Sequence, residues 1–148
     1  MRALGARLGA AICDAGVESP LVIGLTGELG AGKTTLVAGL LAGLGHAGPV
    51  RSPTYTLIEP YRLAGRDLYH CDLYRLRDPA ELDDLGLRDL AVARSVLLVE
   101  WLERAGSRIG TPDLLLRIAY VPQGRTIDAE SASEAGDQLC SRLRLDPA

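Results

Sequence analysis

The stretch Gly27-Glu28-Leu29-Gly30-Ala31-Gly32-Lys33-Thr34 decides how this sequence folds. Its glycines let the backbone turn its amide groups inward around an anion, where a side chain would obstruct the turn. Lys33 is placed to neutralise phosphate, and the Thr34 hydroxyl is placed to bind magnesium. Fifteen arginines and one lysine make up the basic residues, and that lysine is Lys33. We therefore predict a nucleotide-binding loop whose contacts are Leu29, Gly30, Ala31, Gly32, Lys33, Thr34 and Thr35.

The segments on either side supply the strand and helix that such a loop requires. Residues 21–26 are a short apolar run, typical of a buried parallel strand, and residues 34–44 predict a helix. The other expected elements are a helix at 1–15, extended segments at 54–61 and 66–71 with a turn at 63–65, a short helix between Asp78 and Gly86, strands at 96–99, 114–121 and 125–129, and a helix at 133–143. We expect one α/β domain over residues 1–148. Its predicted architecture is a three-layer P-loop NTPase fold, with a mixed, mostly parallel central sheet and an antiparallel edge.

Length and composition exclude several classes of protein. A chain of 148 residues suits one domain with one core, and 47% apolar residues argue against a disordered chain. The net charge of −3 argues against nonspecific nucleic-acid binding. Three scattered cysteines without metal-ligand spacing indicate reduced thiols rather than a disulfide framework. Because we find neither a long apolar run nor a signal-peptide pattern, we expect a cytoplasmic protein without membrane contact.

Two acidic residues lie at the ends of predicted strands. Glu100 follows the apolar strand 96–99 and would hold magnesium or its waters, where a P-loop protein usually has aspartate. Asp72 ends the extended segment 66–71 and could orient or deprotonate a water molecule. Each residue also has a plainer interpretation: Glu100 as a solvated carboxylate that opens the next helix, and Asp72 as an exposed residue in a turn. The residues alone leave both questions open.

The segment Arg51-Ser52-Pro53-Thr54-Tyr55-Thr56 follows the helix of the loop. Nucleotide switches commonly carry a hydroxyl at this place, where it senses the terminal phosphate. Pro53 keeps Ser52 extended. A plain loop that enters a strand is an equally good interpretation. His70 and Trp101 flank the two acids, but position alone assigns neither of them a role.

Four blocks of the sequence resemble the TsaE (YjeE) family of ATPases, which act in bacterial tRNA threonylcarbamoyladenosine synthesis. The blocks are 27–35, 52–61, 69–76 and 98–101, with a weaker match at Gly124-Arg125. The resemblance implies an ATPase with ATP and Mg²⁺ as cofactors. It also implies TsaD and TsaB as partners and a contact with tRNA that is indirect or transient. In this family ATP hydrolysis supports repeated threonylcarbamoyl transfer to adenosine 37 of tRNA.

The same resemblance implies roles for individual residues. Lys33 would bind phosphate, Thr34 and Glu100 would serve Mg²⁺, and Asp72 would be needed for hydrolysis. Residues 52–56, with Thr54 among the nucleotide contacts, would act as a switch-like loop. Trp101 would lie close to the nucleotide. These roles come from matched positions in the family and not from spacing.

Two departures and two rival functions accompany the resemblance. Family members have a short strand before the first helix, so we expect the sheet to lack an edge strand or the true start to lie upstream. Cys71 stands where an apolar aromatic residue is common.

A P-loop small-molecule kinase would need an arginine-rich lid, and none stands out in the sequence. A GTP-dependent switch would read guanine with an Asn-Lys-x-Asp motif, but the sequence contains no asparagine. Adenine is therefore favoured.

Overall fold

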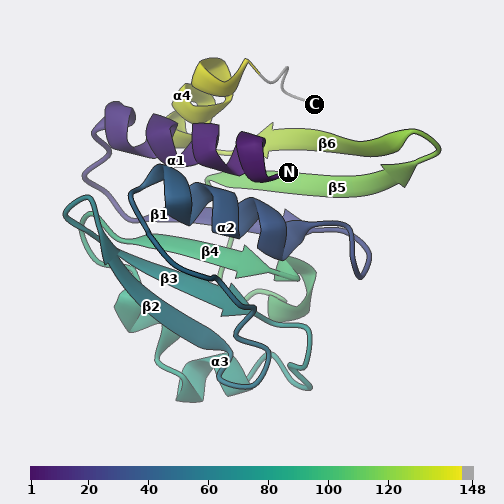
Figure 1. The fold of residues 1–148 in the computed structure, drawn as a ribbon. Helices are drawn as coiled ribbons and strands as arrows, with labels where there is room; N and C mark the ends of the chain where they lie inside the picture. The colour runs from purple at the N-terminus through teal and green to yellow at the C-terminus, as the bar shows by residue number, and fades with distance from the viewer. Residues whose placement is uncertain (145–148) are drawn as a thin grey trace.

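The computed structural model describes residues 1–144, which form helices around one six-stranded sheet (Figure 1). The helices are α1 Arg2–Ala15, α2 Lys33–Gly43, α3 Glu81–Asp84 and α4 Glu134–Leu143, with 3-10 helices η1 Leu87–Leu90 and η2 Leu102–Ala105. The strands are β1 Leu21–Thr26, β2 Ile58–Leu63, β3 Arg66–Asp72, β4 Val96–Glu100, β5 Leu114–Val121 and β6 Gly124–Ser131. No helix within residues 1–144 is long and apolar enough to cross a membrane.

The strand order is β2-β3-β4-β1-β5-β6. Pairs β3–β4, β4–β1 and β1–β5 are parallel, whereas β2–β3 and β5–β6 are antiparallel hairpins. The predicted α/β fold is therefore confirmed, with an antiparallel strand at both edges of the sheet. Open sheets of this kind place their ligands outside the carboxyl ends of the parallel strands. In this chain that edge carries the glycine-rich loop after β1 and the ends of β3 and β4.

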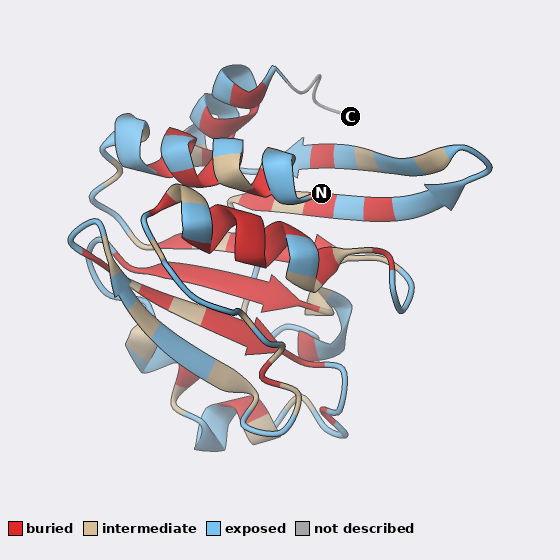
Figure 2. Cartoon of the chain, in the orientation of Figure 1, coloured by how far each residue is buried: buried red, intermediate tan, exposed pale blue. Residues whose placement is uncertain are grey.

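Alternating side chains of the central strands build a core on each face of the sheet. On one face, Leu21, Ile23 and Leu25 are fully buried in a cluster shared with α1, α2 and α4. On the other face, Leu97 and Val99 pack in a second cluster with residues of the short helices α3, η1 and η2. Figure 2 shows the central strands as mostly buried and the outer surfaces of the helices as exposed. These two layers of helices fix the central strands in place.

Helices α1 and α2 approach each other through glycines. A Cβ added at Gly5 would lie 2.1 Å from the Leu36 carbonyl oxygen, and one at Gly39 would lie 2.1 Å from the Arg2 carbonyl oxygen. Both distances are far below a van der Waals contact, so only glycine permits this spacing. The close packing fixes α2, whose first turn follows the glycine-rich loop.

Two predicted elements differ from the structure. Strand β2 begins at Ile58 and not at Thr54, because residues 54–57 form a turn in which the Leu57 N–H donates to the Pro53 carbonyl at 2.7 Å. Leu57 has a φ of +64°, a conformation that a strand cannot hold. The helix after Asp78 is a single turn. The Asp78 N–H donates to Glu81 Oε1 at 2.8 Å at its start, and Gly86, with a φ of +62°, follows two residues after its last residue. Helices η1 and η2 were not predicted.

Candidate functional site

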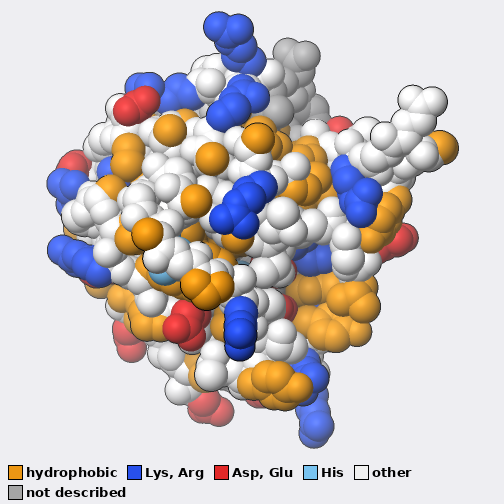
Figure 3. Space-filling model, viewed as in Figure 1, with side chains coloured by type: hydrophobic (Ala, Val, Ile, Leu, Met, Phe, Trp, Pro, Cys, Tyr) orange, Lys and Arg blue, Asp and Glu red, His pale blue; other side chains and the backbone are white. Residues whose placement is uncertain are grey.

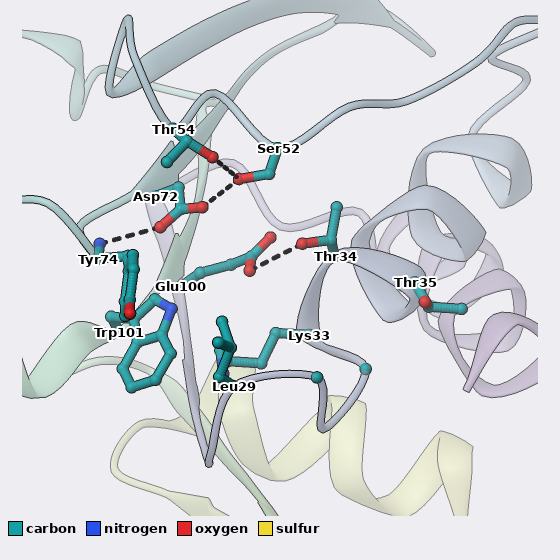
Figure 4. Close-up of a pocket in the computed structure, with 12 residues that line it drawn as sticks. Leu29, Lys33, Thr34, Thr35, Ser52, Thr54, Asp72, Tyr74, Glu100 and Trp101 are labelled. Atoms are coloured by element: carbon teal, nitrogen blue, oxygen red, sulfur yellow. Dashed lines mark hydrogen bonds between the residues drawn. The ribbon is translucent and has the colours of Figure 1, made fainter.

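A cavity of about 360 Å³ lies at the carboxyl ends of β1, β3 and β4 (Figure 4). Its lining contains Leu29, Gly30, Gly32, Lys33, Thr34, Thr35, Ser52, Thr54, Asp72, Tyr74, Glu100 and Trp101. Almost every residue predicted for the site is thus brought to one place. The exception is Ala31, which is fully buried beneath the loop and is not part of the lining. Tyr74, for which no role was predicted, also lines the cavity.

The glycine-rich loop has the backbone conformation that its sequence predicts. Gly27, Gly30 and Gly32 have φ values of +140°, +77° and +111°, which residues with a Cβ rarely adopt. Gly27 is also crowded, since a Cβ there would lie 2.3 Å from the Ile118 carbonyl oxygen. Helix α2 begins at Lys33, so its positive end faces the cavity. A loop of this shape fits an anion.

Lys33 is the cation of the cavity and is only 4% exposed. Its ammonium donates to the carbonyl oxygens of Gly27 at 2.6 Å and Glu28 at 2.9 Å. It also lies 3.8 Å from the centre of the Trp101 ring. Burial lowers the pKa of Lys33, while the nearby charges of Glu100, Glu103 and Asp72 act in the opposite direction. The side chain is therefore held across the loop, with a charge that an anion would stabilise.

Thr34 and Glu100 form a pair that fits a magnesium site. The Thr34 hydroxyl donates to Glu100 Oε2 at 3.0 Å, and Glu100 is only 2% exposed. This burial excludes the interpretation of Glu100 as a solvated carboxylate. Within residues 1–144 no group of three or more His, Cys, Asp or Glu could hold a metal by itself. A hydroxyl and one carboxylate suit Mg²⁺, which takes its other ligands from water and substrate phosphates.

His70 holds the second oxygen of Glu100. Its Nε2 lies 2.7 Å from Glu100 Oε1, and the histidine is fully buried. No role was predicted for His70 from the sequence. A signal was nevertheless present, because His70 lies two residues before Asp72 in β3 and so shares its face of the sheet. The contact fixes the orientation of the Glu100 carboxylate toward Thr34.

Asp72 is 4% exposed and is held by two donors. Its Oδ2 accepts the hydroxyl of Ser52, and its Oδ1 accepts the N–H of Tyr74 at 2.9 Å. The hydroxyl oxygens of Ser52 and Thr54 lie 3.0 Å apart. Asp72 is therefore not an exposed turn residue, and the segment after α2 reaches the cavity through its hydroxyls, as Figure 4 shows.

Aromatic rings form one wall of the cavity. The rings of Tyr74 and Trp101 lie 5.0 Å apart with a 44° tilt. Trp101 has a φ of +59°, and its N–H donates to the Leu25 carbonyl at 2.9 Å. Leu29, on the loop, is 68% exposed. These side chains offer apolar surface beside the phosphate loop, where a nucleotide base could stack.

The strand, glycine-rich loop and helix, with acidic residues from two neighbouring parallel strands, define a P-loop NTPase-like α/β protein. The family model described as "Threonylcarbamoyl adenosine biosynthesis protein TsaE" matches residues 1–127. The chain belongs to the TsaE family.

Individual relatives agree with this assignment. The tRNA threonylcarbamoyladenosine biosynthesis protein TsaE of Haemophilus influenzae is 44% identical over 124 residues, which are 84% of this chain and 78% of that protein. The protein of the same name from Streptomyces coelicolor is 46% identical over 80% of this chain and 78% of its own length. The crystal structure of Bacillus subtilis YdiB superposes with a TM-score of 0.66 at 29% identity, covering 94% of this chain and 86% of that one.

Proposed function

We propose that this chain is an ATPase of tRNA threonylcarbamoyladenosine biosynthesis that works with TsaD and TsaB homologues. The names of its relatives supply the pathway. The observation that carries the enzymatic part is the meeting of Lys33, the Thr34–Glu100 pair and Asp72 in one cavity. Each of these side chains is buried or hydrogen bonded rather than freely solvated by bulk water. Their chemical groups suit the binding of Mg²⁺ and phosphate.

Each residue has a proposed role in nucleotide binding. The amides of Gly30 and Gly32 and the ammonium of Lys33 hold the phosphates. Thr34 and Glu100 hold Mg²⁺, which neutralises charge on the phosphate oxygens when it is bound. His70 keeps the Glu100 carboxylate in its orientation. Trp101 and Tyr74 border the nucleotide on the side away from α2.

Asp72 is the proposed residue for hydrolysis. Both of its oxygens already accept a hydrogen bond, and each carboxylate oxygen can accept a second one. That capacity lets Asp72 orient the attacking water while Ser52 holds the carboxylate in place. Because Ser52 and Thr54 belong to the segment that follows α2, a phosphate bound beside them would also act on this segment.

The surface suits a protein that meets tRNA through partners. On the face that Figure 3 shows, arginine side chains are spread over the surface among apolar and acidic ones. The net charge of −3 adds no general attraction to nucleic acid. TsaD and TsaB homologues are the proposed binding partners because the resemblance to the TsaE family implies them, and the proposed contact with tRNA is indirect or transient.

A reconstituted reaction tests the proposal. Purified chain is added to TsaD, TsaB, threonylcarbamoyl-adenylate and tRNA, and modified tRNA is counted per TsaD. We expect multiple turnovers only with the chain, ATP and Mg²⁺ present together. Modification that does not depend on the chain would contradict the proposal. Transfer of the γ-phosphate to a small acceptor in place of water would instead indicate the rival function, a P-loop small-molecule kinase.

A further inference from the structure

The β5–β6 hairpin contacts the glycine-rich loop through two side chains. The Tyr120 hydroxyl donates to the Leu29 carbonyl oxygen at 3.1 Å. The Arg125 Nε donates to the Ala31 carbonyl oxygen at 3.1 Å. Tyr120 and Arg125 are directly opposite each other in the antiparallel register, and the guanidinium carbon lies 4.2 Å from the centre of the tyrosine ring. The two donors thus form one stacked unit.

The two carbonyls belong to the peptide groups that carry the phosphate-binding amides. The Leu29 carbonyl shares a peptide plane with the Gly30 N–H, and the Ala31 carbonyl shares one with the Gly32 N–H. In a trans peptide the C=O and N–H point in opposite directions, and the described chain has no cis peptide bond. A carbonyl held toward the hairpin therefore turns its amide away from the hairpin. Gly30 and Gly32 both line the cavity, whereas Ala31 lies beneath it.

We propose that Tyr120 and Arg125 are positioning residues for phosphate binding. They hold the Leu29 and Ala31 carbonyls outward, so that the amides of Gly30 and Gly32 face the anion before it arrives. Glycine at these positions makes the peptide planes free to rotate, and the hairpin supplies the constraint that glycine lacks. The inference rests on the proposed function, because it requires that the loop binds a nucleotide.

Four variants on the hairpin test the inference, one of them the conservative change Arg125→Lys. Tyr120→Phe removes one hydroxyl without a change of charge, and Arg125→Ala removes the other donor. Arg117→Ala is the matched control: Arg117 also lies on β5, but its side chain pairs with Glu130 on the opposite face. Affinities for ADP and for AMP are measured through the fluorescence of Trp101, the one tryptophan of the chain. A loss of affinity that affects ADP and AMP equally leaves the ratio of the two affinities unchanged.

We expect the preference for ADP over AMP to fall about threefold to tenfold in Tyr120→Phe and in Arg125→Ala, the effect of one lost hydrogen bond. The preference for ADP should stay unchanged in Arg117→Ala. Arg125→Lys should keep part of the preference that Arg125→Ala loses. Amide spectra of the ADP-bound protein add a residue-specific signature. Tyr120→Phe should reduce the ADP-induced shift of the Gly30 amide, and Arg125→Ala that of the Gly32 amide.

The outcomes separate the inference from the proposed function. An effect of Arg125→Ala without one of Tyr120→Phe would mean that arginine charge attracts phosphate, and it would overturn the positioning role. Unchanged ratios in both variants would overturn it as well. Wild-type chain that binds neither ADP nor ATP would contradict the proposed function itself, and the inference with it.

Discussion

Asp72 and Glu100 are register partners on the parallel strands β3 and β4, so two buried carboxylates end neighbouring strands. Each is held by its own donors: Asp72 by Ser52 and the Tyr74 N–H, and Glu100 by Thr34 and His70. The pairing keeps both carboxylates beside Lys33 while giving them different surroundings. We therefore expect substitutions at the two positions to have different consequences.

Asp72→Asn should slow ATP hydrolysis strongly and spare ATP binding. The amide keeps the size of the carboxylate, but it cannot orient water with the same charge, so the rate of ATP hydrolysis should fall about 100-fold or more. The Kd for ATP should stay within about twofold, because the proposed role of Asp72 is to orient water and not to contact phosphate. Single-turnover hydrolysis and Trp101 fluorescence measure the two quantities. A Kd that rises as steeply as the rate falls would place Asp72 in nucleotide binding instead.

Glu100→Gln should change the dependence on magnesium. Loss of the charge beside Thr34 should raise the Mg²⁺ concentration for half-maximal activity at least about tenfold, since Mg²⁺ prefers carboxylate oxygen. ATP binding without Mg²⁺ should change little. Titration of hydrolysis with Mg²⁺ checks the expectation, with Glu134→Gln as the control, because Glu134 is exposed on α4 and lies outside the cavity lining. An unaltered Mg²⁺ titration for Glu100→Gln would contradict its role as a ligand.

His70→Phe should have a milder form of the same effect. The ring keeps most of the buried volume but leaves Glu100 Oε1 without its partner, so Mg²⁺ affinity should fall about tenfold. His70→Gln, which can still donate to Glu100, should recover part of the loss. A change in the free energy of unfolding with no change in the Mg²⁺ titration would make His70 a packing residue only.

Lys33 should make nucleotide binding sensitive to alkaline pH. Burial lowers the pKa of Lys33 from 10.5, so the nucleotide-free folded protein loses this proton before the unfolded chain does. At pH values between the pKa of Lys33 in the folded state and its pKa in the unfolded chain, the unfolded chain binds more protons. The contribution of Lys33 to the free energy of unfolding therefore rises with pH in that range. Phosphate favours the charged amine, so ATP affinity should fall as pH rises, with proton uptake on binding. Calorimetry in two buffers of different ionisation enthalpy measures that uptake. Lys33→Met should bind ATP more weakly, and its remaining binding should proceed without the proton uptake.

Gly39→Ala should destabilise the fold without acting on the site directly. The added Cβ would meet the Arg2 carbonyl, and forced separation of α1 and α2 should cost about 1–3 kcal/mol. Ala42→Ser, at an exposed position of α2, should change the free energy of unfolding by less than about 0.5 kcal/mol. Urea denaturation measures both variants. Equal stability of Gly39→Ala and the wild type would show that the helices tolerate a wider spacing.

Local patterns in the sequence predicted much of the fold. The glycine-rich loop between an apolar strand and a helix placed β1 and α2 to within a residue, and the strands expected at 114–121 and 125–129 coincide with β5 and lie within β6. The turn at residues 54–57 was missed, because its positive-φ Leu57 depends on contacts with Pro53 and Asp72. Single-turn helices such as η1 and η2 carry too few residues for a periodic signal.

The main residues of the site were predicted from the sequence, but the contacts that support them were not. Lys33, Thr34, Asp72 and Glu100 were identified from spacing and resemblance, and they meet in the cavity. The supporting contacts join residues far apart in the chain, as Tyr120 and Leu29 are, and no local pattern indicates them. His70 was passed over because a histidine in a strand is commonly a packing residue, and only the alignment of β3 with β4 brings it to Glu100.

One measurement tests most directly whether this cavity drives tRNA modification. Threonylcarbamoyl groups transferred per TsaD are counted in a reconstituted mixture with ATP, once with the wild-type chain and once with Asp72→Asn. We predict repeated transfer with the wild type and a stop after a single transfer with the variant, which still binds ATP. Repeated transfer at the same rate with both chains would contradict the proposal that hydrolysis in this cavity supports the modification.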